Sequence, residues 1–127
     1  MTLELEGLTK VYKDKTALDD VSFSFTPGIY GLLGPNGAGK STMMNLISDN
    51  LTPSKGRVLL DGRGIDELGS EYRMLLGYMP QQQNIYPELS LRRFLYFMAS
   101  LKGLKKSEAG EDIDHYVRMV KLDDVLG

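Results

Sequence analysis

Residues 34–42 could bind a phosphate group, because they combine three glycines with one lysine and two hydroxyl side chains. They read Gly-Pro-Asn-Gly-Ala-Gly-Lys-Ser-Thr and match the phosphate-loop pattern G-x-x-x-x-G-K-[S/T] at every fixed position. The glycines let the backbone curl so that successive N–H groups point at one phosphate, and a following helix adds a favourable dipole. Lys40 would reach the β- and γ-phosphates, and Ser41 would offer its hydroxyl to Mg²⁺. The segment therefore predicts that the chain binds a nucleoside triphosphate.

A phosphate loop needs a strand before it and a helix after it, and the flanking sequence predicts both. Residues 29–33 are a short apolar run behind the turn signal Pro27-Gly28, which predicts a buried strand. Residues 40–48 have the apolar pattern of a helix. This context makes a chance glycine-rich turn the weaker interpretation.

The remaining elements divide the chain into two parts. Further strands are expected at residues 3–8, 21–25, 57–60 and 75–79, which makes residues 1–87 the part rich in strands. Beyond that point Ser90 is a good N-cap for a helix that lasts until Gly103, and Ser107 opens a second helix. Residues 88–127 are therefore expected to be helical.

Length and composition are those of one modest soluble domain. With 127 residues the chain can bury a core, and a net charge of −2 gives no hint of a nucleic-acid surface. The absence of cysteine excludes disulfides and thiolate metal sites and fits a reducing compartment. Residues 1–6 do not look like a signal peptide, and no apolar run approaches membrane-spanning length. Any link to a membrane is therefore expected to go through a partner.

The order of these features resembles the ATP-binding subunit or domain of ABC (ATP-binding cassette) transporters, and the likeness covers essentially the whole chain. Residues 8–12 and 17–23 are similar to the opening of that family, in which the aromatic residue, here Tyr12, stacks on adenine. Stacking on a tyrosine contributes about 1–3 kcal/mol and reads base identity poorly. The resemblance thus assigns ATP binding to Tyr12 and to Gly34, Pro35, Asn36, Gly37, Ala38, Gly39, Lys40, Ser41 and Thr42.

Residues 77–81 are similar to the Q-loop of the family, whose glutamine contacts Mg²⁺ and the attacking water. The family's register selects Gln81, although Gln82 and Gln83 follow directly and leave the register open by a residue. The resemblance gives Lys40 and Gln81 catalytic roles and makes Ser41 and Gln81 the Mg²⁺ contacts. Residues 85–90 resemble the stretch that leads into a helical subdomain, where a transmembrane partner docks.

Several later parts of the family pattern are missing, namely the L-S-G-G-Q signature, the strand that ends in Asp-Glu and the switch histidine. The chain stops at Gly127, about where the approach to the signature would begin. We therefore expect an α/β fold, a phosphate-loop NTPase core of the ABC type with an antiparallel β subdomain, plus the start of a helical subdomain, with the C-terminal half absent. Such a piece should turn over little ATP. Because strand 29–33 would lack its neighbouring strands, the piece should also be unstable or self-associate.

The resemblance implies that the intact protein binds Mg-ATP and hydrolyses it to drive transport across a membrane. Its expected partners are a transmembrane subunit and a second ATP-binding domain in a head-to-tail dimer, without nucleic acid. It would lie in the cytoplasm, held at the inner face of the cell membrane by that partner. A soluble ABC-type ATPase that acts on nucleic acid or ribosomes, and a non-catalytic nucleotide-binding module, stay open as alternatives. The sequence does not indicate which substrate is transported or in which direction.

Other acidic residues and the one histidine imitate functional motifs. Residues 58–61 look like a strand that delivers a carboxylate to Mg²⁺, but no glutamate follows, so a turn at Asp61 is the better interpretation. The D-x-x-G of residues 61–64 lacks the N-K-x-D motif that a GTPase needs. Asp66 and Glu67 are expected to be a solvated pair, and His115 a surface residue.

Overall fold

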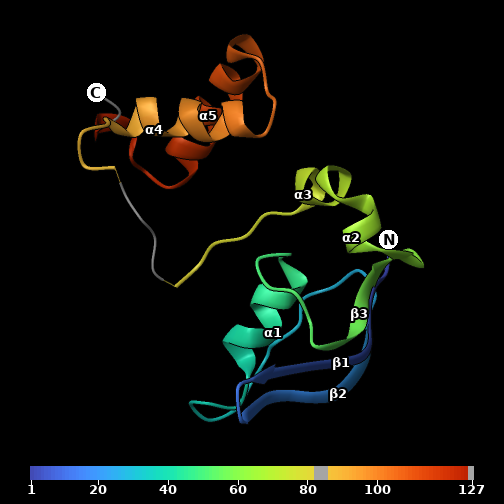
Figure 1. Ribbon diagram of the computed structural model, residues 1–127. Helices are drawn as coiled ribbons and strands as arrows, with labels where there is room; N and C mark the ends of the chain where they lie inside the picture. Colours follow the sequence, from blue (N-terminus) through green and yellow to red (C-terminus); the bar gives the residue numbers. More distant parts are fainter. Residues whose placement is uncertain (82–85, 126–127) are drawn as a thin grey trace. The chain divides into compact units, whose positions relative to one another are not determined.

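The computed structural model describes residues 1–81 and 86–125 and divides the chain into two compact units, Met1–Tyr78 and Met79–Gly127 (Figure 1). Each unit has its own cluster of buried apolar residues. Gln82, Gln83 and Ile85, which the sequence interpretation had drawn on, lie outside the described residues.

The first unit is built on an antiparallel sheet of four strands: β1 (Leu3–Tyr12), β2 (Lys15–Phe25), β3 (Lys55–Leu60) and β4 (Arg63–Gly64). The strand order is β2-β1-β3-β4. Across the sheet Leu5 pairs with Phe23 on one side and with Val58 on the other. The strands expected at residues 3–8, 21–25 and 57–60 are confirmed, and β1 and β2 run further than expected because they form a long hairpin.

Helix α1 (Lys40–Ile47) lies against this sheet and confirms the expected helix after the glycine-rich loop (Figure 1). Its apolar residues Met43, Leu46 and Ile47 follow the three-and-four spacing that places side chains on one helix face. Burial of a leucine such as Leu46 contributes about 1.5–3 kcal/mol. The buried core of the unit is formed by Leu5, Leu8, Leu18, Leu46, Val58, Ile65 and Tyr72.

Two short helices, α2 (Ile65–Leu68) and α3 (Ser70–Leu75), follow β4, and they correct the sequence interpretation. The strand expected at 75–79 is wrong, because Leu75 ends α3 and residues 76–80 have no regular structure. The helical signal was present as apolar residues at 65, 68, 72 and 76, and these pack onto the core. Asp66 and Glu67 are exposed as expected, although they lie in the first turn of α2 rather than in a loop.

The expected strand at 29–33 is also wrong. Ile29 is 103% exposed and Leu33 is 92% exposed, and no strand in the described part of the chain pairs with this segment. The apolar pattern indicates that a segment can pair, but a strand forms only where a partner supplies the hydrogen bonds. The segment that leads into the glycine-rich loop therefore has no regular structure, and its residues are exposed.

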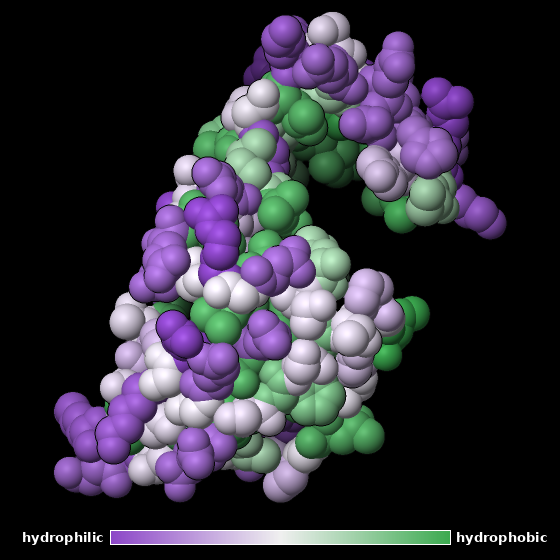
Figure 2. Space-filling model, turned by 90° about the vertical axis from the view of Figure 1, so that its right-hand side faces the viewer, coloured by the Kyte–Doolittle hydropathy of each residue, from purple (hydrophilic) through white to green (hydrophobic). Residues whose placement is uncertain are grey.

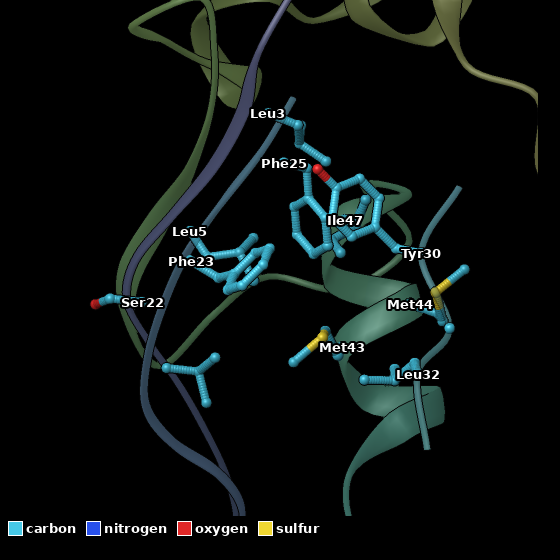
Figure 3. A pocket seen from close by; sticks show the side chains of 12 residues that line it. Leu3, Leu5, Ser22, Phe23, Phe25, Tyr30, Leu32, Met43, Met44 and Ile47 are labelled. Atoms are coloured by element: carbon cyan, nitrogen blue, oxygen red, sulfur yellow. The ribbon is translucent and has the colours of Figure 1, made fainter. Parts of the chain in front are cut away.

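An apolar groove of about 380 Å³ lies between β2, residues 30–32 and α1 (Figure 3). Tyr30 packs its ring edge against Phe25, with 5.0 Å between centroids, and Phe23 lies 4.6 Å from Phe25. Ser22 points away from the groove and accepts the N–H of Gly7. The lining is suited to covering by apolar side chains and not to holding a phosphate.

The second unit is a pair of helices, α4 (Leu91–Leu101) and α5 (Lys106–Met119), with the 3₁₀ turn η1 (Asp123–Val125) behind them. Both expected helices are confirmed, with Ser90 at the N-cap position of α4. Helix α5 begins at Lys106, so Ser107 is its second residue and does not open it as expected. The core consists of Ala109, Ile113 and Val117 packed against Leu95, Tyr96 and Ala99. His115 is exposed as expected. Figure 2 shows that apolar side chains, in green, also reach the surface of the molecule.

Candidate phosphate-binding site

The glycine-rich loop is closed by its own backbone just before α1 begins. The Ala38 N–H donates to the Pro35 carbonyl over 3.2 Å, and the Gly39 carbonyl accepts the Met43 N–H over 2.9 Å. Gly37 (φ +86°) and Gly39 (φ +84°) are both in the left-handed region, which glycine adopts without strain. The N–H groups of Lys40 and Ser41 then open the first helical turn, where helix geometry provides no intrahelical acceptors. These two N–H groups can therefore donate hydrogen bonds to an anion.

Lys40 lies across this loop. Its Nζ donates to the Gly34 carbonyl over 2.5 Å and to the Pro35 carbonyl over 2.8 Å. The first turn of α1 contains no acidic side chain, so nothing on the helix itself offsets the positive end of its dipole. A lysine, a helix start and left-handed glycines together make a site whose charge and geometry suit a phosphate.

Gly39 fixes the loop against the hairpin. A Cβ added to Gly39 would lie 2.2 Å from the Ala17 carbonyl oxygen on β2 and 3.3 Å from the Leu18 side chain. The backbone of the loop thus contacts β2 more closely than any side chain would allow. The motif alone explains this glycine by its conformation, whereas the packing against Ala17 became visible only in the structure.

Replacing Gly39 by alanine should therefore destabilise the first unit more than the same change at Gly37. Both positions have positive φ, which costs an alanine about 1–3 kcal/mol, but a Cβ on Gly37 would meet no atom within 4 Å. We expect Gly37→Ala to lower the free energy of unfolding by about 1 kcal/mol and Gly39→Ala by at least about 3 kcal/mol. Urea unfolding of the two variants measures the difference. Equal losses would contradict the packing role.

Tyr12 ends β1 and is 45% exposed. The Lys10 ammonium lies 5.5 Å from the centroid of its ring. Tyr12 pairs with Lys15 at the closed end of the hairpin, two residues before Ala17, whose carbonyl the loop contacts. The structure thus brings the tyrosine to the end of the sheet that carries the phosphate loop, with part of its ring open to solvent.

The other predicted residues are placed as follows. Ser41 is exposed at the start of α1, and Thr42 beside it is half-buried. Gln81 belongs to the second unit and is exposed, so the structure does not join it with the loop, and its role stays a prediction. Asp61 lies in the turn between β3 and β4, where its carboxylate accepts the Thr2 N–H over 2.6 Å. The turn interpretation of Asp61 is confirmed.

No metal-binding group of three or more His, Asp or Glu side chains lies within residues 1–81 and 86–125. The one hydroxyl suited to a phosphate-bound Mg²⁺ at this site is that of Ser41, because it stands at the start of the helix beside Lys40. The site residues thus fit a metal that arrives with a nucleotide and keeps most of its waters.

A glycine loop closed by a lysine at the start of a helix places the chain among the phosphate-loop proteins. The family model described as ABC transporter matches residues 18–126, which is most of the chain. The chain therefore belongs to the ABC transporter family. Its sheet and helices form part of an ABC ATP-binding domain.

Individual proteins that the chain resembles support this family assignment. The chain is 42% identical over 115 residues to human ATP-binding cassette sub-family A member 9, covering 90% of this chain and 7% of that protein. It is 32% identical over 121 residues to the uncharacterized ABC transporter ATP-binding protein MJ1023 of Methanocaldococcus jannaschii, covering 94% and 42%. A solved ATP-binding subunit of an ABC transporter superposes with a TM-score of 0.81 at 28% identity, over 99% of this chain and 53% of that chain.

The chain thus spans less than half of these two relatives and about half of the solved subunit. What a whole ABC protein does is accordingly a proposal for this chain. None of the helices described in residues 1–81 and 86–125 combines the length and apolarity that crossing a bilayer demands.

Proposed function

We propose that this chain binds Mg-ATP as part of the ATP-binding subunit of an ABC transporter. The observation that carries the proposal is the position of Lys40, whose ammonium spans the loop carbonyls at a helix start without acidic residues. An anion that enters there meets a full positive charge, the N–H groups of the first turn and the helix dipole together.

The proposal assigns a role to each site residue. The backbone N–H groups of residues 36–41 surround the β-phosphate, except that of Ala38, which donates to the Pro35 carbonyl. Lys40 turns from the loop carbonyls toward the β- and γ-phosphate oxygens. Ser41 donates an oxygen to the metal, and Tyr12 stacks on the base. Mg²⁺, when bound, offsets the phosphate charge. Gln81 would contact the metal and orient the attacking water.

For the whole protein we propose ATP hydrolysis that drives transport. Positioning and electrostatic stabilisation would supply most of the rate, as in other phosphoryl transfers. The subunit would pair head-to-tail with a second ATP-binding domain and dock on a transmembrane partner, at the inner face of the cell membrane. Residues 1–87 would then serve the nucleotide and residues 88–127 would begin the helical subdomain. The names of the relatives, which are ABC transporters and ATP-binding proteins, support this extension.

Titration of the full chain with Mg-ATP tests the proposal directly. We expect saturable binding that ADP competes away, and a melting temperature that rises with nucleotide concentration. At 100 times the dissociation constant, binding to the folded state alone adds about 2.7 kcal/mol of stability. Absence of both saturable heat and any thermal shift at millimolar Mg-ATP would show that the loop does not act as a nucleotide site.

Removing the ring of Tyr12 should weaken Mg-ATP binding about 5- to 150-fold, since stacking on an aromatic ring contributes about 1–3 kcal/mol. Tyr12→Phe keeps the ring and should stay within about threefold of the wild type. Calorimetric titration of Tyr12→Ala and Tyr12→Phe separates base stacking from the hydroxyl. An alanine variant that binds like the wild type would make Tyr12 a surface residue only.

A further inference from the structure

The last residue of the first unit is attached to the phosphate-loop helix. The Tyr78 hydroxyl donates to Oδ1 of Asn45 on α1, over 3.3 Å. Residues 76–80 have no regular structure, so a side-chain bond of this kind influences where the segment lies. The hydrogen bond of Tyr78 thus holds the end of the first unit on α1.

Asn45 stands in a specific relation to the candidate site. It follows Ser41 by four residues within α1, and residues four apart lie on the same face of a helix, one above the other. The Tyr78 hydroxyl is therefore attached to the face of α1 whose first turn carries the candidate Mg²⁺ ligand. A second tyrosine, Tyr72 on α3, donates to the Ile47 carbonyl at the other end of α1.

We infer that Tyr78 is a positioning residue for Gln81, which in the proposed function contacts the metal and the water that attacks the γ-phosphate; the inference rests on that function. Gln81 follows Tyr78 by three residues in the sequence, and three residues span at most about 11 Å. The hydrogen bond to Asn45 fixes the starting point of this short run on α1, on the Ser41 face. Loss of the bond should disturb the contact that Gln81 makes, whereas the phosphates held by the loop itself should be unaffected.

The test compares the affinities of the full chain for Mg-ATP and Mg-ADP by calorimetric titration. Tyr78→Phe should raise the dissociation constant of Mg-ATP about fivefold, as expected for one lost hydrogen bond, and that of Mg-ADP less than about twofold. Asn45→Ala should have the same effect, and the double variant should lose nothing more, because both changes remove one interaction.

Tyr72→Phe is the matched control. It removes the same atom from a tyrosine that also bonds α1, but this tyrosine is buried in the core and lies nine residues before Gln81. We expect it to lower the melting temperature and to affect the two nucleotides equally.

The outcomes are distinct. If the wild-type chain binds neither nucleotide, the proposed function fails and the inference falls with it. If the wild type binds both, and Tyr78→Phe leaves the ratio of the two affinities unchanged, the inference alone is overturned. A Tyr78→Phe variant that loses both nucleotides equally, as expected of Tyr72→Phe, would also overturn it, because the role would then be structural.

Discussion

Lys40→Ala should weaken Mg-ATP binding by at least about 100-fold, the largest effect expected of any single change in the site. A hydrogen bond to a charged group contributes about 1.5–3 kcal/mol, and each 1.4 kcal/mol corresponds to a factor of ten. Lys40 would make two such bonds to phosphate oxygens, one each to the β- and γ-phosphates. Its present bonds to the carbonyls of Gly34 and Pro35 offset a part of this gain. Calorimetric titration of the variant with Mg-ATP measures the loss.

Lys55→Ala is the control for Lys40→Ala. It removes the same charge from the same unit, at the exposed first residue of β3, and it should leave the affinity within about twofold of the wild type. Circular dichroism of both variants checks that they fold alike. Equal affinities of the two variants would mean that the backbone N–H groups hold the phosphates without the lysine, and the assignment of Lys40 would be refuted.

The sequence predicted the elements whose stabilising contacts are local or periodic. Helix α1 follows from its apolar spacing, and the alternation in residues 3–8 and 21–25 follows from one buried sheet face. The second unit was predictable for the same reason, because Ile113 and Val117 repeat at one helical turn. Strand 29–33 failed on a tertiary requirement. Its five residues can pair, but no described strand stands beside them.

In the candidate site too, the local features could be predicted from the sequence and the long-range contacts could not. The loop motif lies within nine consecutive residues, so its type and spacing could be recognised without a structure. The approach of Gly39 to Ala17 and the bond between Tyr78 and Asn45 join positions 22 and 33 residues apart. No local pattern reports such pairs, because they depend on how α1 packs on the sheet and where the chain returns to it.

Residues 29–33 should make the wild-type chain self-associate, and charged substitutions there should prevent it. The segment is exposed and no described strand pairs with it, and it lies beside an apolar groove of about 380 Å³ (Figure 3). Exposed strand edges pair with other chains, and apolar patches of this kind promote association. At about 50 µM, within the range where exposed edges aggregate, light scattering should give an average mass at least twice the 14.2 kDa of one chain. The double variant Ile29→Glu, Leu33→Glu should return the mass to that of one chain.

The matched control places the same two charges at the C-terminal end of α5, as Met119→Glu on its last residue and Val120→Glu directly after it, where the side chains are 63% and 61% exposed. Both double variants change the net charge from −2 to −4, so general repulsion between chains acts equally in the two. We expect this variant to associate like the wild type, because the two charges lie at the end of a helix, whose backbone hydrogen bonds are made within the helix itself. A wild-type chain that stays monomeric, with a sharp melt independent of concentration, would mean that the segment is already satisfied within one chain.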